Sequence, residues 1–324
     1  MADGSLPDES AVRRFAVDLD RLVPGTAPLG LAVSGGADSL ALLLLAAAAR
    51  PGAVRAVTVD HGLRRESAEE ARQVRSICLD REIPHSILKA DWPEGPPISN
   101  IEASARKIRY ARLAHWATGE GLTHIATAHH AEDQAETMLM RLARGAGLSG
   151  LTAIREQRPL GEKVTLVRPL LHWPRATLRA LVEATGLPII DDPMNKDPSH
   201  DRARLREALR EAGFGDAAKF AESAAHLAEA EQALGWAARL IYPHRVKEDG
   251  DGLLFAHRGL PREILRRILL MAFDSLHRSP PRGPDLARAI DGLFEGRQAA
   301  LGGLLLSVKG ENWRIAPAPP RRAL

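Results

Sequence analysis

The sequence predicts an α/β fold in which a parallel sheet carries helices on both faces, followed by a helical linker and a small α+β domain. Apolar, strand-like runs alternate with amphipathic helical runs from about residue 27 to residue 190. This alternation is typical of a parallel sheet whose crossover connections are helices. From residue 201 the pattern changes to long, alanine-rich helical runs, which indicates a second structural region.

Five apolar runs are the predicted strands and six amphipathic runs are the predicted helices. Strands are expected at residues 29–33, 54–60, 85–89, 123–128 and 164–169, and helices at 12–22, 38–49, 67–81, 100–119, 131–144 and 175–185. Residues 91–99 are rich in proline and glycine, which favours either a loop over the site or a plain connector. Ligands bind beyond the carboxyl ends of parallel strands, so the segments that follow the strands are the first candidates for a site.

A chain of 324 residues is long enough for two or three domains. Further helices are expected at about 202–212, 216–240, 262–276 and 284–295, with strands at 304–308 and 312–315. These patterns divide the chain into an N-terminal extension (1–26), an α/β domain (27–200), a helical linker (201–243), a small domain (244–316) and a disordered tail (317–324).

Composition excludes several classes of protein. The single cysteine, Cys78, excludes an internal disulfide framework, a cysteine-rich zinc or iron–sulfur site and a CxxC redox pair. Aromatic residues make up 4% of the chain, which argues against base stacking on aromatic platforms. A net charge of +3 permits an RNA partner without requiring one. No signal peptide or membrane span is visible, so we expect a cytoplasmic protein.

The segment SGGADS, which follows the first predicted strand, is the most informative in the chain. Two glycines let the backbone approach a ligand closely, and the N–H groups of the helix that follows favour phosphate. Ser34 and Ser39 add hydroxyl donors, and Asp38 adds a carboxylate suited to Mg²⁺ carried by phosphates. An ordinary strand–turn–helix corner is the alternative, and the lysine of GxxxxGK[ST] is missing. We predict a pyrophosphate cradle formed by Ser34, Gly35, Gly36, Ala37, Asp38 and Ser39.

Two further polar segments follow predicted strands. Asp60 and His61 come after the second strand and could offer backbone groups to an adenine or a ribose, although a simple turn fits the pattern as well. His129 and Asp133 come after the fourth strand, with Asp133 in the first turn of a helix. We expect Asp133 to join Asp38 in holding Mg²⁺ or in polarising a nucleophile. A permanent metal site formed by His129, His130 and Asp133, with His61 or Asp60 added, is the alternative.

The helix at 131–144 is expected to bury one apolar stripe and to leave the other side near the site. The stripe consists of Ala135, Met138, Leu139 and Leu142, which leaves Asp133, Gln134 and Thr137 nearer the cleft or its rim.

Basic side chains on two helices are candidates for phosphate or RNA contacts. Glu102, Arg106 and Arg109 share one helical face, so an arginine there, or Lys107, could grip a phosphate, although a solvated salt-bridge face would look the same. Further RNA candidates are Arg141 and Arg144, which could instead favour the negative helix end, and Asn195, Arg202 and Arg206 near the domain junction.

Six motifs occur in order: SGGADS, VDHGLR, NIEASARKIRY, TAHHAEDQAETMLMRLARGAGLSGL, RPL and DPMN…DRARLR. With them the chain closely resembles the bacterial tRNA(Ile)-lysidine synthases, which are N-type (PP-loop) ATP pyrophosphatases. The resemblance covers roughly residues 27–210 and implies a Rossmann-like (adenine nucleotide alpha hydrolase-like) sheet. The chain is similar to a short form of the family that lacks the second C-terminal domain of longer members.

The resemblance implies an activity and its partners. ATP and Mg²⁺ would bind together with the tRNA(Ile) whose CAU anticodon begins with the target cytidine. The C2 oxygen of that base would be adenylated with release of pyrophosphate, and L-lysine would then displace AMP. Asp38, Asp133, Arg106 and Arg109 would be the catalytic residues, and no membrane is involved. Family members are often homodimers, and the sequence shows no interface.

Three alternatives from other classes stay open on the residues alone. A tRNA thiolase of the same superfamily usually needs cysteine pairs or an iron–sulfur site, which one cysteine cannot supply. A glutamine-dependent amidation enzyme would need a glutaminase partner. A non-catalytic nucleotide-sensing or RNA-binding module would keep the cradle without needing Asp38, Asp133 and the arginines together.

Overall fold

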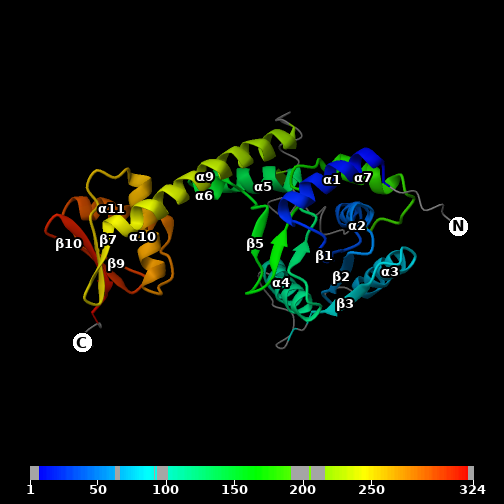
Figure 1. Ribbon diagram of the computed structural model, residues 1–324, viewed down its shortest axis with the longest axis horizontal. Coiled ribbons are helices and arrows are strands. Elements are labelled where there is room, and N and C mark those ends of the chain that lie inside the picture. The colour runs from blue at the N-terminus through cyan, green and yellow to red at the C-terminus, as the bar shows by residue number, and fades with distance from the viewer. Residues whose placement is uncertain are drawn as a thin grey trace. The chain divides into compact units, whose positions relative to one another are not determined.

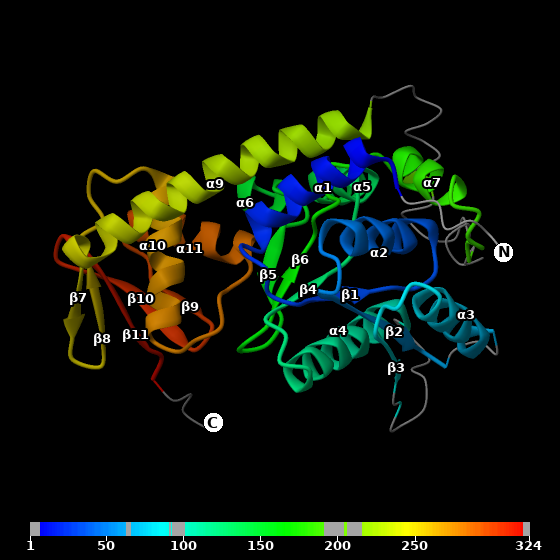
Figure 2. The ribbon, with the colours of Figure 1, turned by 45° about the vertical axis from the view of Figure 1, so that its right-hand side comes forward.

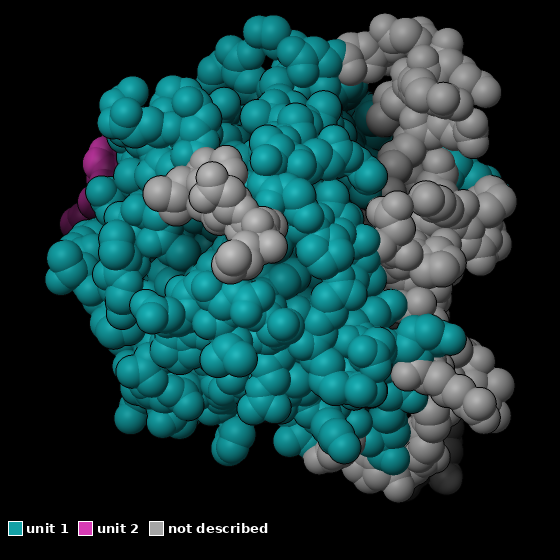
Figure 3. Space-filling model, turned by 90° about the vertical axis from the view of Figure 1, so that its right-hand side faces the viewer, with its two compact units in different colours: residues 1–227 teal, residues 228–324 magenta. Residues whose placement is uncertain are grey.

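The computed structural model describes residues 7–62, 66–90, 92, 101–190, 204–205 and 216–319, without the side chains of residues 101 and 102. The chain forms two compact units, Met1–Leu227 and Ala228–Leu324, which are coloured separately in Figure 3. The boundary expected near residue 200 and most of the helix expected at 202–212 lie outside the described residues.

The first unit is built on a six-stranded sheet with the order β3-β2-β1-β4-β6-β5 (Figure 1). Its strands are β1 (Leu29–Ala32), β2 (Val54–Asp60), β3 (His85–Lys89), β4 (His124–Ala126), β5 (Gln157–Pro159) and β6 (Thr165–Val167). Five strands are parallel, as predicted, but β5 runs antiparallel to β6 at one edge. Only three residues long and mostly exposed, β5 lacks the apolar run that would have predicted it.

Helices cover both faces of this sheet, because successive strand residues point to opposite sides. On one face α1 (Glu9–Leu22), α2 (Ala37–Ala49) and α7 (Arg175–Glu183) pack together, and α3 (Ser67–Leu79) joins their core. On the other face α4 (Ile101–Gly119) packs against β2 and β4 (Figure 2). Two further helices, α5 (Ala131–Leu142) and α6 (Leu148–Leu151), follow β4.

The leucine-rich helix α2 is buried over most of its circumference. It lies between the sheet and the helices α1 and α7, which explains why its sequence shows no polar face. Phe15, Leu19 and Leu22 of α1 are 0–3% exposed and belong to the same core. The N-terminal segment expected as an extension therefore packs as an integral part of the first unit.

The chain reverses direction across the sheet at β1. From β1 it passes to β2 and β3 on one side, and α4 then carries it back to β4 on the other side of β1. The connection after β1 therefore runs toward β2, whereas the connection after β4 runs toward β5 and β6, on the other side of β1. In open α/β sheets such a switch point forms the crevice in which ligands bind.

The second unit is α+β, with an antiparallel sheet of order β7-β8-β11-β10-β9. Its elements are α9 (Ala217–Arg245), which begins in the first unit, β7 (Val246–Asp249), β8 (Gly252–Phe255), α10 (Arg262–Ser275), α11 (Gly283–Phe294), β9 (Ala299–Leu301), β10 (Leu304–Lys309) and β11 (Asn312–Pro317). The core contains Phe255 and Trp313 in edge-to-face contact. The short strands β7, β8 and β9 were not predicted. None of the described helices is long and apolar enough to cross a membrane.

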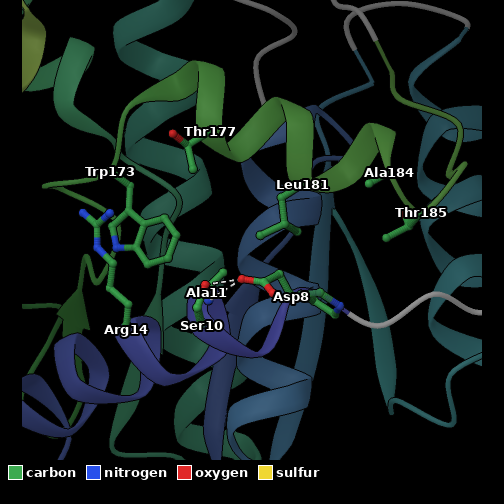
Figure 4. A pocket seen from close by; sticks show the side chains of 10 residues that line it. Asp8, Ser10, Ala11, Arg14, Trp173, Thr177, Leu181, Ala184 and Thr185 are labelled. Atoms are coloured by element: carbon green, nitrogen blue, oxygen red, sulfur yellow. Dashed lines mark hydrogen bonds between the residues drawn. The ribbon is translucent and has the colours of Figure 1, made fainter.

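A pocket of about 350 Å³ lies between α1 and α7 (Figure 4). The guanidinium of Arg14 lies 4.2 Å from the centre of the Trp173 ring, whose Nε1–H donates to Asp18. The pocket is lined by Pro7, Asp8, Ser10, Ala11, Arg14, Trp173, Thr177, Leu181, Ala184 and Thr185. None of them is among the residues predicted for the site, so this pocket is separate from the strand ends.

Glu156 ties α1 to the segment after β6. It accepts hydrogen bonds from Arg21 and pairs with His172 at 3.2 Å, and these partners outweigh burial and lower the pKa of Glu156 to about 2. Glu156→Gln is expected to lower the free energy of unfolding at neutral pH by about 1–3 kcal/mol.

The carboxylate stabilises the fold only while it is ionised. The difference between wild type and Glu156→Gln should therefore be complete above pH 4.5, its unfolded value, and vanish as the pH falls toward 2. Urea unfolding between pH 7 and pH 3 measures it. The exposed neighbour Glu162→Gln is the matched control, and an equal, pH-independent loss in both variants would contradict the assignment.

Candidate active site

The loop after β1 is shaped by the hydroxyl of Ser39. Its Oγ accepts hydrogen bonds from the N–H groups of Ser34 and Gly35, both at 3.1 Å, and donates to the carbonyl of Gly36 at 2.9 Å. The sequence predicts hydroxyl donors from both serines. Ser39 is instead buried and organises the loop, whereas the side chain of Ser34 stays at the surface.

Gly35 occupies a position that no other residue fits. Its φ is +89°, and a Cβ there would lie 2.3 Å from Cδ1 of Ile190 and 3.0 Å from Cγ2 of Val74. The Gly35 carbonyl accepts a hydrogen bond from the N–H of Ile190 at 3.0 Å. The segment before residue 191 therefore packs against the loop and fixes its shape.

Helix α2 begins directly after this loop without a side-chain cap. Gly36 is the N-cap residue, and Ala37 opens the helix. The N–H groups of a first helical turn have no partner within the helix, and they carry the positive end of its dipole. The geometry therefore supports the predicted anion cradle at Gly36, Ala37 and Asp38.

Two carboxylates, each in the first turn of a different helix, lie near His130. Its Nε2 lies 3.6 Å from Oδ2 of Asp38, at the start of α2, and 3.6 Å from Oδ2 of Asp133, in the first turn of α5. The Oδ2 of Asp133 also accepts the backbone N–H of His130 at 3.1 Å. The switch point thus brings together the two acids that the sequence singled out.

Burial and charge set the ionisation of this cluster. Burial raises the pKa of Asp38, and the charges of His130 and Arg175 only partly offset that effect. Burial alone would lower the pKa of His130, but the hydrogen bond to Glu132 and the charges of Asp133 and Asp38 outweigh it and raise this pKa. The raised pKa favours the cationic form of His130, whose charge would offset the repulsion between the two carboxylates beside it.

Two residues of this cluster, Glu132 and Arg175, were not predicted. Glu132 lies 3.0 Å from Nδ1 of His130 and accepts the backbone N–H of Arg175 at 2.9 Å, at the first residue of α7. The side chain of Arg175 returns to within 3.8 Å of Asp38. Since 43 residues separate Glu132 from Arg175, no local pattern in the sequence could have indicated this contact.

His129 lies in a different environment from its neighbour. Its Nδ1 is 3.0 Å from the Thr127 hydroxyl, and burial, together with nearby arginines, lowers its pKa to about 3 despite the charge of Asp133. The side chain is therefore a neutral imidazole at physiological pH. This environment fits the predicted role in binding a nucleotide better than a role as a cation.

The segment after β2 forms a turn. Oδ1 of Asp60 accepts hydrogen bonds from the Gly62 N–H at 2.9 Å and the Ser67 hydroxyl at 2.7 Å, and Gly62 has a φ of +61°. Asp60 is buried, so its carboxylate serves the turn that the sequence offered as the alternative. His61 remains half-buried beside it, and burial and the charge of Arg109 lower its pKa.

Arg106 and Arg109 share one face of α4, as predicted. Their guanidinium carbons lie 5.1 Å and 5.4 Å from the centre of the Tyr110 ring. The side chain of Glu102 lies outside the description, so its pairing with these arginines stays a prediction.

The prediction for α5 was partly wrong. Gln134, placed near the rim, is 3% exposed and exchanges hydrogen bonds with the backbone of Ile154, whereas Leu142, placed in the stripe, is 54% exposed. Ala135 is buried as expected, and Met138 and Leu139 are half-buried. Two hydrogen bonds to the following loop outweigh the apolar pattern and rotate the buried side of the helix.

The predicted RNA contacts are placed only in part. Arg141 donates to the carbonyls of Gly150 and Ala153, both at 2.8 Å, so it holds the loop after α5. Arg144 is exposed. Asn195, Arg202 and Arg206 lie outside the described residues.

Among the described residues, no group of three or more His, Cys, Asp or Glu side chains is arranged to hold a metal ion. Mg²⁺ that arrives with a nucleotide needs only one or two protein carboxylates, because phosphates and water complete its shell. Oδ1 of Asp38 is buried and has no hydrogen-bond partner in the described part of the chain. An oxygen of this kind fits a cation that is supplied together with the substrate.

Glu132→Ala is expected to cost about 1 kcal/mol of stability, because the first turn of α7 loses its acceptor. It should also lower the pKa of His130, which the Glu132 hydrogen bond raises. Urea unfolding and NMR titration of the imidazole measure the two effects. Glu183→Ala, at the exposed end of the same helix, removes only a surface pair and should change neither by much.

A family model described as a PP-loop domain matches residues 9–212. The chain is 41% identical over 303 residues to a tRNA(Ile)-lysidine synthase of Zymomonas mobilis subsp. mobilis, covering 92% of this chain and 91% of that protein. This chain belongs to the tRNA(Ile)-lysidine synthase family. The same name describes a Novosphingobium aromaticivorans relative that is 41% identical over 325 residues, covering 100% of this chain and 98% of that protein.

The six sequence motifs had predicted membership of the lysidine synthase family, and this prediction is confirmed. Among solved structures, a U34-tRNA thiolase from Methanococcus maripaludis superposes with a TM-score of 0.55 at 16% identity. The superposed region covers 68% of this chain and 81% of the thiolase chain. That likeness shows the shared α/β fold alone. The thiolase structure holds a [4Fe-4S] cluster, whereas this chain has a single cysteine, which is buried.

Proposed function

We propose that this protein is a tRNA(Ile)-lysidine synthase, an ATP-dependent ligase that joins L-lysine to C2 of the cytidine that begins the anticodon. Relatives of that name match nearly the whole chain, which is the main support. The approach of Asp38 and Asp133 to one imidazole at the switch point supports this region as the site of the reaction. ATP, tRNA(Ile) and L-lysine are thus the three substrates of the proposed reaction.

The first step activates the base. The C2 oxygen attacks the α-phosphorus of ATP, a phosphorus–oxygen bond to the β-phosphate breaks, and pyrophosphate leaves. The N–H groups of Gly36, Ala37 and Asp38 would hold the departing diphosphate, and their dipoles are already oriented before the reaction. Mg²⁺, when bound with ATP, would neutralise part of the phosphate charge beside the orphaned oxygen of Asp38.

The second step replaces the activated oxygen. The ε-amine of lysine attacks C2, the carbon–oxygen bond breaks, and AMP leaves while the amine passes a proton to solvent water. Asp133 would orient the lysine ammonium, because its Oδ2 and that of Asp38 both lie 3.6 Å from Nε2 of His130. His129 is a poor proton acceptor because its pKa is about 3. Arg106 and Arg109 would stabilise phosphate charge from the α4 side.

A direct assay tests this function. Incubation with ATP, labelled lysine and transcripts of the tRNA should incorporate lysine only when the anticodon begins with cytidine, with release of AMP and pyrophosphate. Incorporation that does not depend on that cytidine would contradict the substrate, and nucleotide binding without turnover would favour a non-catalytic module. The homodimer and the cytoplasmic location stay predictions from the resemblance and the composition.

A further inference from the structure

Four arginines from three parts of the first unit surround the ring of Tyr110. Arg106 and Arg109 come from α4, and Arg158 comes from β5, with its guanidinium carbon 4.3 Å from the ring centre. Arg168 follows β6, and its charge also acts on the Tyr110 hydroxyl. Arg158 was not among the predicted site residues, and β5, which carries it, was not predicted.

Arg168 is a buried cation without a carboxylate partner among the described residues. It is 3% exposed, and one of its nitrogens donates to the carbonyl of Arg155. Neither Arg158 nor Arg168 lies within ion-pair distance of a carboxylate belonging to the described part of the chain. A guanidinium keeps its charge at any physiological pH, so this buried positive charge has to be balanced by other means.

The polar atoms behind the ring are also left unsatisfied. The Tyr110 hydroxyl and the Nε of Arg168 are buried without a hydrogen bond of normal geometry, although the phenol lies beside the guanidinium. Burial would raise the pKa of Tyr110, but the charges of Arg106, Arg109 and Arg168 outweigh it and lower this pKa. The positive field at this place therefore exceeds the cost of desolvating the phenolate.

The cluster lies beside the predicted site and on the other face of the sheet from α2. The charge of Arg109 reaches His61 after β2, and those of Arg106 and Arg168 reach His129 after β4. Tyr110 itself belongs to the core under α4, whereas the pyrophosphate cradle opens α2 in the opposite core. The charge of this arginine cluster could therefore be neutralised by a second anionic group of the substrates, separate from the pyrophosphate.

From this arrangement we infer that Arg106, Arg109 and Arg158 around Tyr110, with the charge of the buried Arg168 adding to theirs, form a binding site for a backbone phosphate of the RNA strand that carries the reacting cytidine. The paired N–H donors of a guanidinium match the oxygens of a phosphate. Several guanidinium groups together offer more donors than one carboxylate could accept. The exposed Arg155 and the exposed residues Gln157 and Pro159 of β5 lie next along the chain, so a polynucleotide could continue past the cluster. The choice of RNA rests on the proposed function.

Arg158→Gln is the variant that tests this site, because Arg158 is half-buried and its loss should leave the fold intact. We expect its affinity for the tRNA to fall roughly 5- to 30-fold at low salt. The slope of log K against log salt should become shallower by about one, and the KM for ATP should not change. Arg158→Lys should recover part of the affinity, because it keeps the charge but not the fork.

Arg55→Gln is the matched control. It removes the same charge from the second residue of β2, at the amino ends of the strands, and should bind tRNA like the wild type. A raised KM for ATP with unchanged tRNA affinity would assign the cluster to a nucleotide phosphate and overturn the inference. Equal binding by Arg158→Gln and Arg55→Gln would also overturn it.

Failure of the proposed function has a different signature. Wild-type protein would then form no lysidine on the cytidine-containing tRNA. The binding comparison between Arg158→Gln and Arg55→Gln needs no turnover, so it would still decide whether the cluster holds an RNA phosphate.

Discussion

Asp38→Asn is expected to slow ATP-dependent pyrophosphate release by about 100- to 1,000-fold, the usual loss when one preorganised charge contact is removed. The amide keeps the size of the side chain but loses the charge that would face Mg²⁺ beside the phosphates. Oδ1 of Asp38 has no hydrogen-bond partner among the described residues, so this oxygen is available to a cation, whereas Oδ2 lies near His130 and Arg175. Single-turnover measurement of pyrophosphate gives the rate, and the affinity for tRNA should stay within about twofold.

The same substitution should not destabilise the free protein. Burial raises the pKa of Asp38 above 3.8, so its ionised form costs folding energy at every pH above that value, and the neutral amide removes this cost. We therefore expect Asp38→Asn to unfold at the same or a higher temperature than the wild type. Asp80→Asn, an exposed acid after α3, is the control for the change in net charge. Normal pyrophosphate release by Asp38→Asn would remove Asp38 from the mechanism.

What the sequence could predict was set by local patterns. The strand before Ser34, the glycines and the alanine- and leucine-rich run of α2 carry their own signals, because strand, turn and helix each have a periodicity or a typical residue. The placement of Asp38 and Asp133 near each other followed from one further rule, that parallel strands end at the same edge of a sheet.

What the sequence could not predict depends on the order of strands. Glu132 reaches Arg175 because α5 and α7 meet beside β1, and the order of the strands is not written in any local segment. Arg158 joins the arginines of α4 only because β5 folds back antiparallel on β6. The rotation of α5 likewise depends on Gln134 meeting the backbone of Ile154. Contacts of this kind need the tertiary structure.

Gly35→Ala is expected to impair both folding and catalysis. The new methyl group would stand 2.3 Å from Cδ1 of Ile190, and a φ of +89° strains any residue with a Cβ. We expect a loss of about 2–4 kcal/mol in the free energy of unfolding, from overpacking and strain together. Because Ile190 and the loop must move apart, the N–H groups of the cradle lose their alignment. The rate of pyrophosphate release should therefore fall by at least about tenfold.

Gly52→Ala separates the effect of backbone strain from the effect of the clash with Ile190. Gly52 has a φ of +72°, but a Cβ there would have no atom within 4 Å, so only the backbone strain is present. Its loss of stability should be about 1 kcal/mol, and its pyrophosphate release should match the wild type. A double variant with Ile190→Ala should restore part of the stability lost in Gly35→Ala, because it removes the side chain that the methyl group meets. If Gly35→Ala instead behaved like Gly52→Ala in both measurements, the close packing of Ile190 on the loop would not control the shape of the cradle.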